Sequence, residues 1–304
     1  MVEFNSIEDV QASLAANRYV ASRGLATAVF LALRLGKPLF LEGEAGVGKT
    51  EVAKVLANML GTRLIRLQCY EGLDVHNAVY EWDYSRQILH LRILEASGAT
   101  RQELEHGIYS RDFLLARPLL QAIEHDGTEV SVLLIDEIDR ADEEFESFLL
   151  EILSDFQITI PEIGTIRAVR PPVVVITSNR TREVHDALKR RCLYHWIDYP
   201  DFETEYTIVQ LKVPDISQRL SFQVVAAVQE LRQHELFKPP GVAETLDWAA
   251  ALLAMNCDEL DEQVVHDTLG VLLKYQDDVQ QVQGALVRDL VGQSRAGSSL
   301  DQPD

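Results

Sequence analysis

The segment 43–50, GEAGVGKT, places a lysine and a threonine directly after a glycine-rich turn. Glycines let backbone N–H groups wrap around phosphate oxygens where a helix begins. The Lys49 ammonium would then reach the β- and γ-phosphates of ATP, and the Thr50 hydroxyl would reach the accompanying Mg²⁺ ion. The residues predicted to form this nucleotide site are Gly43, Glu44, Ala45, Gly46, Val47, Gly48, Lys49 and Thr50.

The residues on either side of this segment fit the same interpretation. The apolar run 39–41 predicts a short buried strand before it, and 51–60 predicts a helix after it, closed by Gly61. A flexible glycine turn is the plainer alternative. We favour the phosphate site because a simple turn requires neither the strand nor the helix.

Two adjacent carboxylates follow the apolar residues of 132–140, VLLIDEIDR. Asp136 stands at the end of the predicted strand, where it would hold Mg²⁺ through water. Glu137, beside it, would polarise a water molecule for attack on the γ-phosphate. The competing interpretation is that these acids only begin a solvated helix. With the phosphate-binding segment upstream, the pair predicts hydrolysis of the nucleotide.

A second strand end and a basic helix end supply further groups. The apolar run 172–178 is followed by Asn179, whose amide could orient the attacking water, although a lone Asn is more often a turn residue. Segment 187–192, ALKRRC, then brings three adjacent cations. An arginine donated to a neighbouring subunit would stabilise charge on the γ-phosphate, with Arg191 as the first candidate and Arg190 as the second. A basic last turn favoured by the helix dipole is the alternative.

These residues require a scaffold that brings strand ends together. The continuous apolar runs 131–136 and 172–178 are typical of parallel strands covered on both faces. Strands alternating with helices predict a doubly wound α/β domain over about 1–200. Helical patterns alone then predict an all-helical domain over 201–291, and the small polar residues of 292–304 predict a disordered tail. The expected helices of the second domain are 202–211, 217–236, 242–255, 261–275 and 279–290.

The composition argues against several classes of protein. A net charge of −20 over 304 residues disfavours an extended nucleic-acid-binding surface. The three cysteines are too far apart for a disulfide framework or a metal site, and the eight histidines show no ligand spacing. The first residues lack a signal-peptide pattern, and charges and a proline interrupt the apolar stretch 25–41. We therefore expect a soluble, cytoplasmic protein without a membrane span.

Taken in order, these motifs resemble those of the AAA+ ATPases, and the finer pattern is similar to that of the MoxR family. Members of that family carry an insert in the second helix and a hairpin before the sensor strand. The candidate insert is about 85–111, and the candidate hairpin is about 156–169, which alternates around a Pro-Glu-Ile-Gly turn. The strings of 135–140, IDEIDR, and 185–200, HDALKRRCLYHWIDYP, most resemble the CoxD branch, which is associated with maturation of carbon monoxide dehydrogenase.

The resemblance implies an α/β AAA+ fold whose all-helical second domain is a lid. It assigns Lys49 and Thr50 to the nucleotide loop, and Asp136 and Glu137 to the metal-binding pair. It also assigns Asn179 to the first sensor and Arg191 or Arg190 to the arginine finger. It also implies a homo-oligomer, a hexamer, that uses ATP hydrolysis to remodel a partner protein. The implied work is assembly of, or cofactor insertion into, a metalloenzyme of the molybdenum- and copper-containing carbon monoxide dehydrogenase type, beside a von Willebrand factor A partner.

Two other functions compete with this one. A nucleic-acid motor or helicase-like ATPase could share the hairpin and the insert, with local support only from Arg167 and Arg170. A P-loop kinase for a small metabolite is disfavoured because Glu137 beside Asp136 favours water as the acceptor.

One segment departs from the family pattern, and another has two interpretations. The lid helix of relatives begins with a small-Pro-Arg signature, whereas 241–247 reads GVAETLD, with Glu244 at the corresponding place. No arginine is available there, so either another cation replaces it or the lid responds less directly to the nucleotide. The aromatics of 79–84, VYEWDY, could line a ring pore or pack against their own domain, and packing is the commoner outcome.

Overall fold

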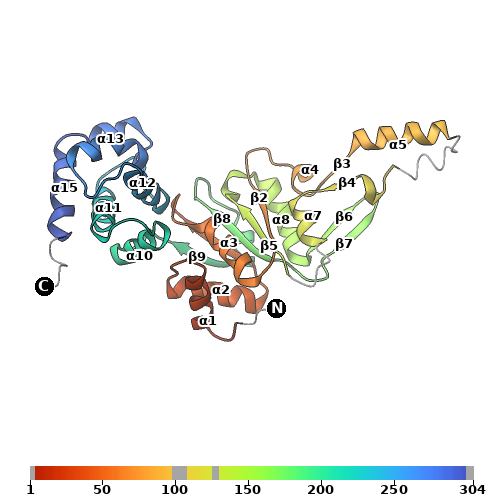
Figure 1. The fold of residues 1–304 in the computed structure, drawn as a ribbon. Helices are drawn as coiled ribbons and strands as arrows, with labels where there is room; N and C mark the ends of the chain where they lie inside the picture. Colours follow the sequence, from red (N-terminus) through yellow and green to blue (C-terminus); the bar gives the residue numbers. More distant parts are fainter. Residues whose placement is uncertain (1–3, 98–107, 125–129, 299–304) are drawn as a thin grey trace. The chain divides into compact units, whose positions relative to one another are not determined.

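The computed structural model describes residues 4–97, 108–124 and 130–298, and its contacts divide the chain into two compact units (Figure 1). Met1–Ser13, Ser22–Glu42 and Thr50–Trp196 form the first unit. Leu14–Ala21, Gly43–Lys49 and Ile197–Asp304 form the second. The glycine-rich loop, Gly43–Lys49, is thus assigned to the second unit, while the residues that follow it are assigned to the first.

The first unit is built on a five-stranded sheet in the order β2-β5-β8-β1-β9. Strand β1 pairs in parallel with β8, β8 with β5, and β5 with β2. Every residue of β5 is buried, as the continuous apolar run predicts. These parallel strands, linked by helices, confirm the predicted α/β class. The arrangement also brings several strand ends to one edge of the sheet. The bounds of the strands are β1 (Leu39–Gly43), β2 (Leu64–Gln68), β5 (Val132–Asp136), β8 (Val173–Ser178) and β9 (Leu193–Ile197).

Polar residues set the ends of the helices that accompany this sheet. Ser6 and Asp9 cap α1 reciprocally, since the Asp9 N–H donates to Ser6 Oγ at 3.1 Å and the Ser6 N–H donates to Asp9 Oδ2 at 3.0 Å. Ser22 caps α2 by accepting from the Leu25 N–H at 3.1 Å. The bounds are α1 (Ile7–Ala16), α2 (Arg23–Leu35), α3 (Lys49–Leu60), α4 (Val75–Ala78), α7 (Pro118–Ile123), α8 (Glu143–Asp155) and α9 (Asp186–Arg191).

An additional segment lies between β2 and β5. Strand β3 (Tyr80–Trp82) pairs antiparallel with β4 (Leu114–Ala116), and the helix α5 (Tyr84–Ala96) and the short helix η1 (Arg111–Phe113) lie between them in sequence (Figure 1). The predicted insert at about 85–111 therefore falls on α5, on the start of η1 and on residues outside the described ones.

The aromatic segment does not form one extended stripe. Tyr80 and Trp82 lie on β3, whereas Tyr84 is the first residue of α5. Trp82 is 7% exposed and contacts Tyr80 and Tyr109 edge-on, with ring centroids 6.1 and 5.4 Å apart. Two of the three aromatics therefore pack against their own unit.

A two-stranded hairpin precedes β8. Strand β6 (Gln157–Ile160) pairs antiparallel with β7 (Gly164–Arg167), in the segment where the alternating pattern predicts a hairpin. Gly164 has φ +101°, which a residue with a side chain rarely adopts, and this lets the chain reverse at the start of β7.

The second unit contains six helices among the residues described from 197 to 298, and its buried core includes Trp248, which is 1% exposed. The predicted helix 279–290 differs from the structure, where α14 and α15 are separated at Gly284 with φ +92°. The predicted tail also differs, because α15 continues to Ser298, over residue types that include the helix formers Arg and Ala; 299–304 lie outside the described residues. The bounds are α10 (Phe202–Lys212), α11 (Gln218–Leu231), α12 (Val242–Ala254), α13 (Glu262–Leu272), α14 (Gln276–Val282) and α15 (Ala285–Ser298).

In the described ranges, no helix has both the length and the apolar character needed to cross a bilayer.

Candidate nucleotide site

The backbone of the glycine-rich loop requires glycine at two positions. A Cβ atom at Gly43 would lie 2.2 Å from the Ile197 carbonyl oxygen, and Gly46 has φ +79°. Both positions therefore require glycine, the first because of close backbone approach and the second because of its left-handed conformation. The sequence prediction of a phosphate-binding loop depends on this freedom.

Lys49 lies folded over the loop that precedes it. Its Nζ donates to the Gly43 carbonyl at 2.8 Å and to the Glu44 carbonyl at 2.5 Å, and the residue is 6% exposed. The ammonium is thus a buried charge held by backbone carbonyls at the start of α3. A phosphate is a stronger partner for it than a carbonyl, because hydrogen bonds between ionised groups are roughly twice as strong.

The start of α12 contacts the same loop within the second unit. The Ala243 N–H donates to the Gly46 carbonyl at 3.1 Å, and Glu244 Oε2 accepts from the Gly241 N–H at 3.0 Å. A Cβ atom at Gly46 would lie 2.9 Å from that Glu244 oxygen. The residue of α12 nearest this glycine is therefore an acid, at the place where the family pattern would have an arginine.

Asp136 is the most fully bonded side chain at the strand ends of the first unit. Its Oδ1 accepts from Thr50 Oγ1 at 2.9 Å and from Thr177 Oγ1 at 2.6 Å. Its Oδ2 accepts from Arg66 Nε at 3.0 Å and from a terminal nitrogen of Arg66 at 2.6 Å. The two residues predicted to bind Mg²⁺, Thr50 and Asp136, are thus in direct contact, and Asp136 is 2% exposed.

Glu137 turns its carboxylate toward the predicted sensor. Asn179 Nδ2 donates to Glu137 Oε1 at 3.3 Å, while Gln68 Nε2 and Arg140 donate to Oε2, each at 3.0 Å. Glu137 adopts φ 56° and ψ 53°, a left-handed backbone that costs about 1–2 kcal/mol for a residue with a Cβ. Strain of this size is retained mainly at functional positions.

Asp139 holds the segment that carries Asn179. Its carboxylate accepts from the Asn179 N–H at 3.1 Å and from the Thr181 N–H and hydroxyl at 2.9 and 2.7 Å. The backbone of the sensor segment is therefore fixed to the residue that follows the carboxylate pair by two positions. This third acid thus fixes the backbone at Asn179 and Thr181.

The three cations of α9 have separate surroundings. Lys189 Nζ lies 3.3 Å from Glu42 Oε1 in the interior. The Arg190 side chain is 82% exposed and lies 3.8 Å from Asp186 one turn earlier. Arg191 donates to the Leu150 carbonyl and to Ser154 Oγ, both on α8. The two finger candidates thus differ, because Arg191 is bound within its own subunit and Arg190 extends into solvent.

The donor set at Thr50 and Asp136 fits a magnesium ion that comes with a nucleotide. Hydroxyl and carboxylate oxygens suit this hard cation, which usually takes one or two protein ligands and completes its shell with phosphates and water. In the described parts of the chain, no three His, Cys, Asp or Glu side chains cluster to hold a metal by themselves.

Cys69 lies beside these groups but carries no chemistry. Its N–H donates to the Asp136 carbonyl at 2.9 Å, and its side chain is fully buried. Burial, and then the charge of Asp136, raise the pKa of the Cys69 thiol to about 12. The sulfur stays protonated at neutral pH and is therefore a poor nucleophile.

Sequence reasoning missed four residues of this arrangement: Arg66, Gln68, Thr177 and Asp139. Arg66 and Gln68 are polar positions on or at the end of a strand, and Thr177 lies in a buried apolar strand. A polar residue near the end of each neighbouring strand was the available signal. It becomes useful only when the strand order is known.

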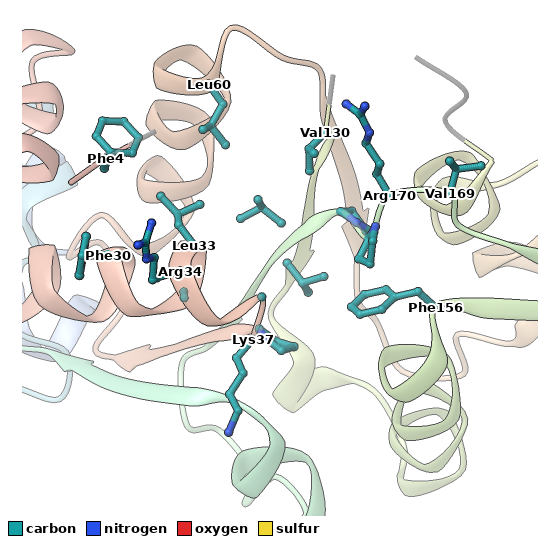
Figure 2. A pocket seen from close by; sticks show the side chains of 17 residues that line it. Phe4, Phe30, Leu33, Arg34, Lys37, Leu60, Val130, Phe156, Val169 and Arg170 are labelled. Atoms are coloured by element: carbon teal, nitrogen blue, oxygen red, sulfur yellow. The ribbon is translucent and has the colours of Figure 1, made fainter. Parts of the chain in front are cut away.

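A cavity of about 570 Å³ lies within the first unit. Figure 2 shows the side chains that line it. Its lining comes from the end of α2, from Pro38 before β1, from Val130 before β5 and from Val173 at the start of β8. It therefore adjoins the amino ends of parallel strands, whereas Asp136 lies at a carboxyl end. The cations in its lining are Arg34, Lys37 and Arg170, and most of the other lining residues are apolar.

The chain is similar to several known proteins. Residues 38–192, about half of the chain, match the family model described as AAA domain (dynein-related subfamily). The gas vesicle ATPase GvpN of Haloferax mediterranei is 26% identical over 244 residues, covering 77% of this chain and 67% of that protein. An uncharacterised protein of Staphylococcus aureus is 28% identical over 174 residues, covering 55% of this chain and 57% of that protein. A RuvB variant from Thermotoga maritima superposes with a TM-score of 0.48 at 17% identity, covering 84% of this chain and 70% of that one.

Proposed function

The chain belongs to the AAA domains of the dynein-related subfamily, and from that premise we propose that it is a MoxR-type ATPase that remodels a partner protein. Members of the family bind ATP and hydrolyse it, and this chain is an ATPase of that family. The observation that carries the proposal is the bonded pair at the end of β5. Asp136 contacts Thr50, and Glu137 contacts Asn179, and these contacts support the roles that we propose for them in hydrolysis.

Each side chain at this edge has a distinct task in hydrolysis. Thr50 and Asp136 would hold Mg²⁺, which neutralises phosphate charge when it is bound. Glu137 would accept a hydrogen bond, and then a proton, from the attacking water. Asn179 and Gln68 fix the direction of the Glu137 carboxylate, since each donates to one of its two oxygens.

We further propose that the chain acts as a homo-oligomeric ring, a hexamer. The exposure of Arg190 supports it as the group that a neighbouring subunit would receive, while Arg191 would first have to release α8. A guanidinium that completes a neighbour's site supplies positive charge to the γ-phosphate only when subunits assemble. The finger assignment therefore ties hydrolysis to assembly.

A protein partner is supported by the surface of α5. The side chains of Tyr84, Ile88, Leu89 and Ile93 are between 55% and 63% exposed, which leaves a cluster of large apolar groups on one helix. Exposed apolar clusters on water-soluble domains mark surfaces for binding proteins or other apolar partners. The charge of −20 makes nucleic acid a poorer partner, because affinity for phosphates depends on cations.

The proposed client is a metalloenzyme of the carbon monoxide dehydrogenase type during its assembly. A von Willebrand factor A protein would be a second partner in this assembly. This client and a cytoplasmic location rest on the sequence resemblance to the CoxD branch. The similarity to a gas vesicle ATPase suggests a gas vesicle protein as the competing client. The two possibilities differ in what should stimulate hydrolysis.

Mixing two inactive variants tests the ring and the finger. Glu137→Gln should bind ATP and stop turnover, and Arg190→Ala or Arg191→Ala should do the same if that residue is the finger, with losses of roughly a thousandfold. Mixed rings contain some interfaces with a sound carboxylate and a sound finger, so ATPase activity should return. If both arginine variants are fully active and the protein stays monomeric with ATP by light scattering, the ring proposal is wrong.

The client is tested by incubating the ATPase with purified dehydrogenase apoprotein, metal cofactor and Mg-ATP. The parent should raise incorporation of the cofactor, Glu137→Gln should not, and a Leu89→Ser variant should keep basal ATPase activity while losing the stimulation. Equal incorporation with parent and Glu137→Gln would contradict this client. Stimulation of ATPase activity by gas vesicle protein alone would favour the competing one.

A further inference from the structure

Glu42 is a buried acid that the hydrolysis chemistry does not use. It lies on β1 one residue before the glycine-rich loop, and it is 4% exposed. A carboxylate withdrawn from water in this way is costly unless its oxygens are hydrogen-bonded. The hydrogen-bond and ion-pair partners of Glu42 therefore indicate which parts of the fold its charge stabilises.

Three elements supply those partners, all within the first unit. Glu42 Oε1 accepts from Ser178 Oγ and lies by Lys189 Nζ, each at 3.3 Å, and Oε2 accepts from Tyr194 OH at 2.9 Å. Ser178 ends β8, Lys189 lies on α9, and Tyr194 lies on β9. Glu42 thus joins β1 to the two strands beside it and to the helix that connects those strands.

Two of these partners stand directly beside residues with a proposed role. Ser178 precedes Asn179, which contacts Glu137, and Lys189 precedes the finger candidate Arg190. Ser178 Oγ also accepts from the Arg180 N–H at 3.0 Å, so it holds the backbone on the far side of Asn179. A displacement of Glu42 would therefore move the sensor segment and the finger helix together.

Lys189 lies between a buried ring and an exposed acid. Its ammonium lies 5.7 Å from the ring centroid of Phe40, which is fully buried on β1, and 3.9 Å from Glu183 at the surface. Tyr194 stacks on the same Phe40 ring at 6.1 Å. Burial, and then the hydrogen bond to Glu42, raise the pKa of Tyr194 to about 12, so its hydroxyl stays a donor.

We propose that Glu42 is a positioning residue that couples the nucleotide loop of a subunit to the arginine-bearing helix α9. It acts through Lys189 and Ser178 and does not touch the reacting atoms. Occupation of the loop that begins at the next residue shifts β1, and the Glu42 network passes that shift to α9. The proposal rests on the proposed finger role of α9, so its test includes a readout that needs no hydrolysis.

Amide hydrogen exchange of residues 186–191 provides that readout. A non-hydrolysable ATP analogue should change exchange in α9 of the parent, and Glu42→Gln should bind the analogue within about twofold of the parent yet lose this change. The amide keeps the shape of the side chain but removes the charge opposite Lys189. A parent whose α9 exchange does not respond, or a Glu42→Gln variant whose α9 responds as the parent does, would overturn the coupling.

Further variants separate positioning from folding. Tyr194→Phe removes one hydrogen bond without burying a new polar group, and it should weaken the α9 response in the same direction. Glu183→Gln, which alters the exposed acid 3.9 Å from Lys189, is the matched control and should respond as the parent does. If Glu42→Gln unfolds, Tyr194→Phe decides the proposal by the same exchange measurement.

Steady-state kinetics then distinguish this proposal from the proposed function. Glu42→Gln should lower kcat roughly tenfold with little change in KM, as expected when a reacting group is misplaced and not removed. A parent that lacks ATPase activity would refute the proposed function, while the exchange result would still decide the coupling. An unchanged kcat together with an unchanged α9 response would refute the role of Glu42.

Discussion

Each unit of the chain contains a buried carboxylate that forms an ion pair with an arginine. Asp136 pairs with Arg66 in the first unit, and Glu205 pairs with Arg232 in the second. The acids are similarly hidden, with side chains 2% and 0% exposed. The arginines differ, because the side chain of Arg66 is 52% exposed and that of Arg232 only 5%. A half-exposed guanidinium can return to water when a cation arrives, whereas a buried one cannot leave without opening the fold.

The surroundings of the two acids show the same contrast. Glu205 takes two contacts from Arg232, at 2.6 and 2.7 Å, and others from Thr245 and Gln229, which join α10, α11 and α12. Arg232 is fixed further by the Pro240 carbonyl at 2.8 Å. The pair in the second unit is therefore structural, and the pair in the first is suited to exchange one partner for another.

The largest effect is expected from breaking the structural pair. Glu205→Gln leaves the Arg232 charge buried without its counter-charge, so the free energy of unfolding should fall by about 3–5 kcal/mol. Urea unfolding followed by circular dichroism measures this. The exposed pair of Arg219 and Glu259 in the same unit supplies the control, since Glu259→Gln should cost about 0–1 kcal/mol. Equal losses in the two variants would show that Glu205 is not a structural charge.

The next effect concerns the acid of the first unit. Asp136→Asn should lower kcat by roughly a hundredfold to a thousandfold, because the carboxylate that we propose as a ligand of Mg²⁺ is lost. Calorimetry with ATP in the absence of Mg²⁺ should still show binding to the loop. If turnover survives at the parental rate, Asp136 has only the structural function that Glu205 has, and the contrast between the two pairs fails.

Removing the exposed arginine should have a smaller effect. Arg66→Gln removes the counter-charge of Asp136, but Thr50 and Thr177 still donate to that carboxylate, so the free energy of unfolding should fall by less than in Glu205→Gln. The Mg²⁺ concentration that gives half-maximal ATPase activity should fall by roughly twofold to fivefold, since the cation no longer competes with a guanidinium. Arg63→Gln, one residue before the same strand, is the matched control. An unchanged requirement for Mg²⁺ would mean that Arg66 does not occupy the place of the metal.

The contrast also shows which features local sequence predicts. The glycine-rich loop and strands β5 and β8 follow from spacing and apolar runs, which are properties of neighbouring residues. The acids Asp136 and Glu137 could be placed because they come directly after such a run. Their contacts with Thr50 and Asn179 are consistent with that placement, although the roles of these residues stay predictions.

Contacts across the sheet could not be predicted in this way. Arg66 and Thr177 meet Asp136 only because β5 lies between β2 and β8, an order that depends on long-range pairing. The same holds for the contact of Arg191 with α8, which no local pattern indicates. The break at Gly284 was missed for a different reason, since a single glycine in an apolar helical pattern is compatible with a continuous helix.

The smallest effect concerns pH and an imidazole of the first unit. Burial lowers the pKa of His195, on β9, from its ordinary value of 6.5. The unfolded chain therefore takes up this proton at a higher pH than the folded protein does, so the stability that the neutral imidazole contributes is present above about pH 6.5 and lost as the pH falls. Urea midpoints of the parent and of His195→Gln should consequently converge between pH 7.5 and 5.5. His266→Gln, at an exposed imidazole, controls for removing a histidine as such. Because His195 is only half-buried, the convergence should be small, and midpoints that diverge as the pH falls would show that burial does not govern this group.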